Sequence, residues 1–343
     1  MTGLGEFSLI ARYFTRPSGE RRGVGDDCAL IDVGGATLAL TSDMLLEGVH
    51  FFPGAAPRDL GHKALAVNLS DLAAAGARPR CFLLDLALPA ADPEWLEAFS
   101  GGLFELAHEQ GCALIGGDTT RSPAVDARPG TIVIAITAIG VVAPGAWRGR
   151  DGARPGDDLW VSGTLGDAAL ALAVRRADRG LAPPLRVDDG PAWRDALGDC
   201  LARMDRPTPR TALGQALAGL ASAAIDVSDG LVGDLRHILQ RSGVGAELAW
   251  RDLPCAPAFA FVEPALRRRC VLAGGDDYEL LFTAPRADRA AVAGLAATLG
   301  PLTRIGCITA GGGLRVLDDE PGDAAAELHA FDHFLDPGER DGR

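Results

Sequence analysis

The chain has 343 residues, 48% of them hydrophobic, and a formal net charge of -13 at pH 7. A chain of this length exceeds what one hydrophobic core usually serves, so we expect two domains of similar size. The negative charge repels phosphate backbones and no local basic patch offsets it, which argues against nucleic acid as a partner.

Neither a membrane span nor an export signal is evident. No window holds the roughly 18 uninterrupted apolar residues that a membrane-spanning helix needs. Glu6 stands ahead of any apolar run, where a signal peptide would carry basic residues. We therefore predict a cytoplasmic protein that does not enter a membrane. The seven cysteines are scattered without a CxxC pair, so we expect reduced thiols.

In the first half, apolar runs typical of β-strands alternate with helical patterns. The strands are expected at residues 37–41, 81–88, 112–115 and 131–142. Between them, Asp59 is expected to cap a helix that runs toward Gly76, and Pro93 to open a second helix through Leu106. Together they predict an N-terminal domain over residues 1–143.

Glycine and proline are concentrated at residues 144–157, which predicts a link between two domains. A C-terminal domain is then expected over residues 158–335. Its predicted elements are a strand at 158–162, a Gly-rich turn, a helix from Asp167, and strands at 224–227 and 278–284. Residues 175–191 read as a loose surface insertion, and residues 336–343 as a frayed tail.

Acidic residues recur where apolar segments end, each beside glycine, serine or threonine. The clusters are Gly25–Asp27, Thr41–Asp43, Ser70–Asp71, Gly116–Thr120, Asp226–Gly230 and Gly274–Asp277. Because segment ends in an α/β protein gather at one rim, we expect the clusters to meet. Aspartate and glycine are also common in turns and caps, which is the competing explanation for any single cluster.

Asp71 is the most informative of these residues, because it lies within the apolar segment Leu65–Ala75, where an unpaired carboxylate is costly to bury. Lys63, the single lysine of the sequence, stands two helical turns earlier and is not an obvious partner. Oxygen ligands without a His/Cys set favour Mg²⁺, Ca²⁺ or Mn²⁺ over zinc. The sequence thus predicts a site for divalent cations, and six clusters could serve several ions.

A nucleotide site would need a design other than the Walker A loop, because Lys63 is followed by Ala64 rather than by Ser or Thr. Gly-rich turns can present backbone N–H groups to phosphate, and Gly116–Gly117 and Gly163–Gly166 each follow a predicted strand. Arg150 could supply a guanidinium to phosphate, with a solvated linker arginine as the alternative.

Together the motifs resemble the thiamine-monophosphate kinase family, of the superfamily that includes aminoimidazole ribonucleotide synthetase and selenophosphate synthetase. The resemblance spans nearly the whole chain. It is carried by Gly5–Phe7, Val24–Ala29, Thr41–Leu45, Gly48–Phe51, Lys63–Gly76, Ile115–Arg121, Ile225–Leu231, Gly274–Leu280 and Asp332–Phe334.

The resemblance implies an α+β fold, with an N-terminal domain whose sheet pairs across a homodimer and a C-terminal α/β sandwich domain. It implies phosphorylation of thiamine monophosphate to thiamine diphosphate, by direct in-line transfer from ATP with several Mg²⁺ ions. No covalent or general-base residue is expected, because a phosphate nucleophile is already ionised at neutral pH. The motifs leave open whether K⁺ assists.

By position, the resemblance implies metal ligands at Asp27, Thr41, Ser42, Asp43, Asp71, Asp118, Asp226 and Asp229. It implies ATP contacts at Gly117, Asp118, Arg150 and Ser228. It implies contacts to thiamine phosphate at His50, Asp276 and Phe331. The family commonly has Glu at the position of Asp276, and Trp or Tyr near that of Phe331.

Two alternatives remain at this point. An enzyme like aminoimidazole ribonucleotide synthetase shares the ATP-dependent logic and would act on a ribonucleotide amidine. A non-catalytic Mg-nucleotide sensor would bind Mg-ATP without releasing ADP. Selenophosphate synthetase is disfavoured because it needs a reactive Cys in a Gly-rich N-terminal segment, whereas Cys28 follows two aspartates.

Overall fold

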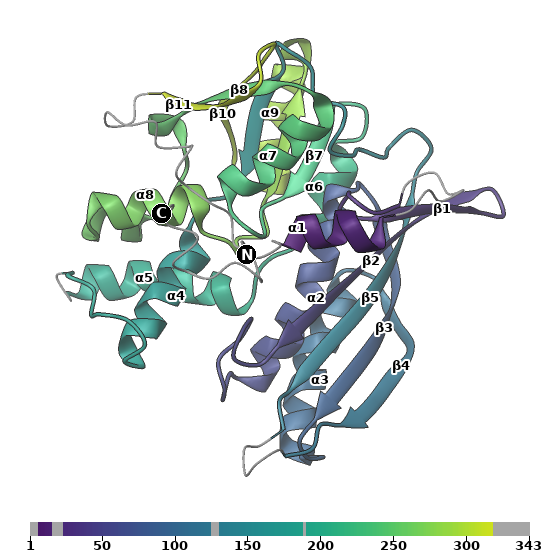
Figure 1. The fold of residues 1–343 in the computed structure, drawn as a ribbon, viewed down its shortest axis with the longest axis vertical. Helices are drawn as coiled ribbons and strands as arrows, with labels where there is room; N and C mark the ends of the chain where they lie inside the picture. Colours follow the sequence, from purple (N-terminus) through teal and green to yellow (C-terminus); the bar gives the residue numbers. More distant parts are fainter. Residues whose placement is uncertain (1–5, 16–22, 125–129, 188–189, 318–343) are drawn as a thin grey trace.

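The computed structural model describes residues 6–15, 23–124, 130–187 and 190–317. These residues form two β-sheets, one from each half of the chain, with helices packed against both (Figure 1). At this level the predicted combination of helices and sheets is confirmed. No helix in the described part of the chain is both long and apolar enough to cross a membrane.

The N-terminal sheet has the strand order β1-β2-β5-β3-β4. Its strands are β1 (Ala29–Val33), β2 (Ala36–Leu46), β3 (Arg78–Leu88), β4 (Ala113–Arg121) and β5 (Val133–Val142). Neighbouring strands are antiparallel except β3 and β4, which are parallel because a helix crosses over between them. Strand β1 was not predicted, and β2 and β4 run well past their predicted ends.

Helices α2 (Pro57–Ala74) and α3 (Pro93–Glu109) cover one face of this sheet (Figure 1). As predicted, α3 opens with Pro93, and Asp92 caps it by accepting from the backbone N–H of Glu94. The predicted cap at Asp59 is wrong. Because proline is pre-organised for the first helical position, α2 begins at Pro57 and places Asp59 in its first turn. A short helix α1 (Glu6–Leu9) and a π-helical turn (Ile10–Phe14) precede the sheet.

The C-terminal sheet has the order β11-β8-β10-β6-β9-β7. Its strands are β6 (Asp158–Ser162), β7 (Ala223–Asp226), β8 (Gly245–Ala249), β9 (Leu280–Ala284), β10 (Leu302–Thr309) and β11 (Gly313–Leu317). Every residue of β6, β7 and β9 is buried, because helices cover both faces of the sheet at these strands.

Two groups of helices provide this cover. The larger hydrophobic core joins one face of the sheet to α4 (Asp167–Asp178), α5 (Pro191–Asp205), α7 (Leu231–Ser242) and α8 (Pro264–Ala273). A smaller core joins the other face to α6 (Thr211–Ala216) and α9 (Arg289–Leu299). Short 3₁₀ turns occupy Trp250–Asp252, Pro257–Phe261 and Arg286–Asp288.

Residues 175–191 are not a loose insertion throughout, so that prediction is wrong at both ends of the range. Helix α4 continues to Asp178, and α5 begins at Pro191. Arg175 donates from both terminal guanidinium nitrogens to the carboxylate of Asp205 and so ties α4 to α5. The ion pair between Arg175 and Asp205 therefore stabilises the last turn of α4.

Helix α2 also packs against the C-terminal half. Ala73 and Ala74, at its end, share the smaller core with Trp160 and Phe282 of the second sheet. Near its start, the ring Nε2 of His62 lies 2.9 Å from the carbonyl oxygen of Pro207. Helix α2 therefore packs against both halves of the chain and fixes their relative position.

The crossing of α2 and α3 predicts a large effect of Gly61→Ala. A Cβ atom there would lie 2.0 Å from the carbonyl oxygen of Phe99, so the helices must separate. We expect a loss of on the order of 2–4 kcal/mol in the free energy of unfolding, measured by urea denaturation.

The matched control is Gly198→Ala, on the exposed side of α5 with no atom within 4 Å of its added Cβ. It should instead stabilise the protein by about 0.5–1 kcal/mol, through helix propensity alone. Equal effects of the two substitutions would show that the close approach of the helices is not what matters at Gly61.

Candidate active site

Three carboxylates from distant parts of the sequence meet between the two sheets. Asp27 precedes β1, Asp71 lies on α2, and Asp226 ends β7, and one oxygen of each lies within 4.8 Å of the others. The side chain of Asp27 is 3% exposed, and Asp226 is 2% exposed. Three like charges buried this closely repel one another, so this acidic cluster requires cations or protons.

The pKa values of these acids are raised for the same reason. Burial and then the nearby Asp27 raise the pKa of Asp226 to about 8. Burial and then Asp43 raise the pKa of Asp71 well above its ordinary value. The pKa of Asp43 rises to about 6 and that of Asp229 to about 7, mainly through burial. Without cations, the site therefore holds protons at pH values where exposed carboxyls are ionised.

Hydroxyl and amide side chains orient the acidic cluster. Ser70, on α2, donates to Asp226 Oδ2 at 2.6 Å, and the hydroxyl of Thr41 donates to Asp71. The backbone N–H of Asp43 donates to Asn68 Oδ1 at 3.1 Å. The roles of Asn68 and Ser70 were not predicted. Their signal in the sequence is the same as that of Asp71, namely a polar side chain inside an apolar helical segment.

Arg150 provides a positive charge at the edge of the acidic cluster. Its Nη2 donates to Asp27 Oδ1 at 2.5 Å, and its side chain is 14% exposed, so the alternative of a solvated linker arginine is wrong. Although burial lowers the pKa of Arg150, the charge of Asp27 outweighs it and raises that pKa overall. The Arg150 carbonyl accepts a hydrogen bond from Ser242, which fixes the link at this point.

The donor set fits hard divalent cations. The atoms that converge are carboxylate and hydroxyl oxygens, and the three residues of the cluster are all aspartates. Such sets suit Mg²⁺, Mn²⁺ or Ca²⁺, and one guanidinium cannot neutralise three carboxylates. Of the predicted ligands, the structure brings together Asp27, Thr41, Asp43, Asp71 and Asp226. Asp229 follows in the turn before α7, half-buried.

Ser42 is not part of this group through its side chain. Successive residues of a strand point to opposite faces, so Ser42 lies on the exposed face of β2, away from Thr41 and Asp43. Its hydroxyl shares a hydrogen bond of 2.9 Å with that of Thr137 on β5.

Gly117 and Asp118 lie apart from the acidic cluster of their own chain. They are inside β4, the exposed edge strand, and not in a turn after it as predicted. In the register of the sheet, Asp118 is separated from β2 by three strand spacings, which is about 14 Å. Gly117 has φ 140°, and a Cβ there would lie 1.9 Å from the carbonyl oxygen of Leu84, so only glycine fits.

The remaining predicted contacts surround the acidic cluster unevenly. Ser228 lies in the half-buried turn between β7 and α7. His50 follows β2, and its Nδ1 accepts a hydrogen bond of 2.9 Å from the backbone N–H of Leu46. Asp276 precedes β9 and accepts from Lys63, so the lysine excluded as a partner of Asp71 serves another acid. Phe331 lies outside the described residues.

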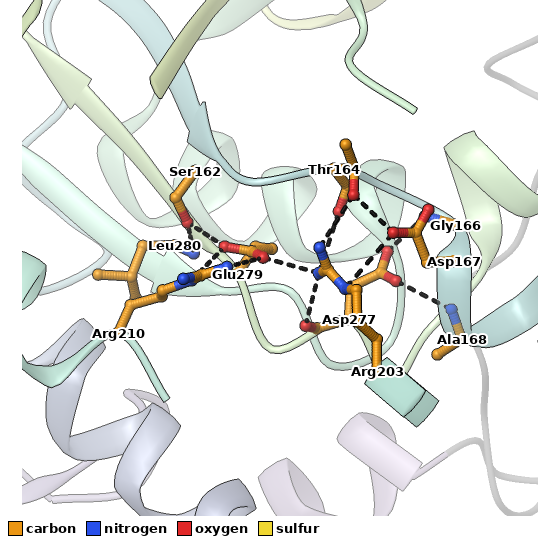
Figure 2. A network of polar contacts seen from close by, with 10 residues as sticks. All are labelled: Ser162, Thr164, Gly166, Asp167, Ala168, Arg203, Arg210, Asp277, Glu279 and Leu280. Carbon is orange, nitrogen blue, oxygen red and sulfur yellow. Dashed lines mark hydrogen bonds and ion pairs between the residues drawn. The ribbon is translucent and has the colours of Figure 1, made fainter. Parts of the chain in front are cut away.

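A second polar network supports the segment before β9 (Figure 2). Glu279, 1% exposed at its side chain, accepts from Arg203 at 2.7 Å and from Arg210 at 2.5 Å. Asp277 accepts from the backbone N–H of Gly166 at 2.6 Å and so caps α4, which has no cap of its own. Asp277 belongs to the predicted cluster Gly274–Asp277, but the contacts of these four side chains were not predicted, since arginine partners far apart in sequence leave no local pattern.

Comparison with known proteins gives a consistent result. Residues 25–142 match the family model of the AIR synthase related protein, N-terminal domain, and residues 154–319 that of the C-terminal domain. The thiamine-monophosphate kinase of Escherichia coli K12 is 44% identical over 97% of this chain and 99% of its own.

Two solved structures are similar over nearly their whole length. The thiamine-monophosphate kinase of Stenotrophomonas maltophilia K279a is 45% identical, with a TM-score of 0.75 over 93% of this chain and 98% of that one. AaThiL complexed with AMPPCP and TMP is 32% identical, with a TM-score of 0.78 over 96% of this chain and 97% of that one.

Removal of divalent cations should make the stability fall as pH rises. The raised pKa values of Asp43, Asp229 and Asp226, about 6, 7 and 8, mean that the folded protein binds more protons than the unfolded chain between about pH 4 and 8. Stability is therefore present at low pH and is lost as pH rises through these values. In chelator, we expect Tm to drop by about 5 °C or more from pH 6 to pH 8.

Added Mg²⁺ should raise Tm more at pH 8 than at pH 6, because it competes with fewer protons. Asp226→Asn should make the pH dependence in chelator shallower. A Tm that is flat or rises over this range would contradict the assignment of buried, protonated acids.

Proposed function

The chain belongs to the thiamine-monophosphate kinase family, and we propose on this basis that it phosphorylates thiamine monophosphate to thiamine diphosphate by direct in-line transfer from ATP, assisted by several Mg²⁺ ions. The observation that carries the proposal is the convergence of Asp27, Asp71 and Asp226 within 4.8 Å. The ATP analogue and TMP held by AaThiL support the choice of substrates.

The residues of the chain hold and orient the reactants. The acidic cluster, with Thr41, Asp43 and Asp229, would hold the metal ions, while Gly117, Asp118, Arg150 and Ser228 contact ATP. Bound Mg²⁺ neutralises the repulsion between two polyanions and stabilises charge on the transferring group. His50, Asp276 and Phe331 contact the acceptor. No side chain removes a proton, because the attacking phosphate is already ionised.

The proposal divides the chain at the link. Residues 1–143 form a metal- and ATP-binding domain, and residues 158–335 complete the metal and substrate site. Residues 144–157 join them and carry Arg150 against Asp27, so the link itself takes part in the site. We also propose that the reaction takes place in the cytoplasm.

A homodimer would explain how Gly117 and Asp118 contribute to a site from which they lie apart in their own chain. The sheet face opposite α2 and α3 carries exposed apolar side chains, such as Met44 at 60% exposure, beside Ser42 and Thr137. Pairing of this face with a second copy would cover it. The same pairing would bring Asp118 of the partner subunit toward the acidic cluster, which Asp118 does not reach within its own chain.

The central test is ADP release from Mg-ATP with thiamine monophosphate, thiamine or no acceptor, with the product identified by mass. We expect thiamine diphosphate from thiamine monophosphate alone. Asp71→Asn should lower turnover at saturating Mg²⁺ by at least about 100-fold, since it removes a cation ligand.

The exposed Arg315→Gln is the matched control and should leave the turnover unchanged. Repeating the assay with and without K⁺ shows whether a monovalent cation contributes. Turnover on a ribonucleotide amidine with none on thiamine monophosphate would favour the synthetase alternative. Binding of Mg-ATP with no ADP release from any acceptor would favour the sensor.

Completion of each site across the dimer predicts that two inactive variants rescue each other. Asp71→Asn and Asp118→Asn, co-expressed with different tags, should form heterodimers in which one of two sites is intact. Random assembly makes half of the dimers mixed, so we expect about a quarter of the wild-type activity.

Asp71→Asn with Asp226→Asn is the matched control. Both substitutions lie in the acidic cluster of a single chain, so this pair should not recover activity. If Asp118→Asn alone is active, or if co-expressed Asp71→Asn and Asp118→Asn stay inactive, the partner subunit does not complete the site.

A further inference from the structure

Asp276 is held by one residue from each half of the chain. Lys63, on α2, donates to Asp276 Oδ2 at 2.8 Å, and its side chain is only 6% exposed. The phenol of Tyr278 donates to Asp276 Oδ1 at 2.9 Å. Lys63 also donates to the carbonyl oxygen of Met204 at 3.1 Å, which fixes the ammonium group itself.

The backbone around Asp276 is strained and firmly supported. Asp276 has φ 69° and Tyr278 has φ 52°, and no other non-glycine residue in the described part of the chain has a positive φ. Such conformations are rare for residues other than glycine and persist where the surroundings impose them. Here the N–H of Asp276 donates to the Ser228 carbonyl at 2.8 Å, and that of Tyr278 to the Val227 carbonyl at 2.9 Å.

The residues between and after these two are also fixed. Asp277 caps α4, and Glu279 is clamped by Arg203 and Arg210 in the network of Figure 2. The segment is thus anchored on both sides of Tyr278, directly after Asp276. Together with the contacts of Asp276 itself, these hydrogen bonds fix the orientation of the Asp276 carboxylate.

The carboxylate of Asp276 still has acceptor capacity facing solvent. Its side chain is 39% exposed although its lysine partner is buried. A carboxylate offers about four acceptor positions, and two of these are occupied by Lys63 and Tyr278. Because Lys63 balances its charge, Asp276 presents a hydrogen-bond acceptor rather than a net negative charge.

We propose that Lys63 and Tyr278 are positioning residues that hold Asp276 as an oriented, charge-balanced acceptor for an N–H donor of the phosphoryl-accepting substrate. The inference rests on the proposed function, in which Asp276 contacts that substrate. An ionised carboxylate accepts hydrogen bonds and has none to donate to phosphate oxygens, so Asp276 contacts the end remote from the reacting group. In thiamine monophosphate, the N–H donor at that end is the amino group of the pyrimidine ring.

Steady-state kinetics of Lys63→Met and Tyr278→Phe test the proposal. Loss of one charge-assisted hydrogen bond to Asp276 should raise KM for thiamine monophosphate about tenfold, with kcat and KM for ATP changed by less than about twofold. Wild type should discriminate against the analogue in which the pyrimidine amino group is replaced by oxygen. Lys63→Met should lose most of that discrimination.

His62→Leu is the matched control for a merely structural effect. His62 is the neighbouring residue on α2 and also contacts a carbonyl of the C-terminal half, but it does not touch Asp276. It should leave KM for thiamine monophosphate unchanged. An equal rise of KM in His62→Leu, or a fall of kcat in place of the KM effect in Lys63→Met, would overturn the proposal.

Amide hydrogen exchange tests the positioning without any turnover. Exchange in residues 274–280 should accelerate in Lys63→Met but not in His62→Leu, and unchanged exchange in Lys63→Met overturns the positioning role. A wild-type protein that makes no thiamine diphosphate would overturn the proposed function and with it the role of Asp276 in substrate contact. Accelerated exchange would then still establish that Lys63 holds the segment.

Discussion

The burial of Asp27, Asp71 and Asp226 against one another is the constraint on which the rest of the structure depends. Charges of one sign at this separation in a poorly hydrated site oppose folding. They persist because the segment before β1, α2 and β7 each contribute one acid and are held together by other contacts. The hydrophobic cores thus supply the free energy that keeps an electrostatically unfavourable cluster assembled.

The packing of helix α2 holds several polar residues of the site in place. Its apolar side chains pack against the N-terminal sheet and into the smaller core of the C-terminal half. Its polar residues Lys63, Ser70 and Asp71 contact Asp276, Asp226 and Thr41. A helix buried on nearly all sides can carry such polar groups only where each has a partner. The same helix therefore holds Asp71 in the acidic cluster and Lys63 against Asp276.

Much of the site could be predicted because its chemistry is local in sequence. A carboxylate in an apolar segment, as at Asp71, signals a partner wherever the chain folds. Strands and helices with clear periodicity were found, including α3 with Pro93 at its start. Long-range partners could not be found this way, since nothing near Glu279 or Asp276 in sequence indicates Arg203, Arg210 or Lys63.

The sequence by itself determined which residue types converge and hence that hard cations and phosphate suit the site. It also determined α3 and the buried strands, whose patterns depend only on spacing. Only the tertiary structure decided that Ser42 lies on the exposed face of β2 and that Asp118 stands on a distant edge strand. These facts depend on strand order and register, which arise from contacts between segments far apart in the chain.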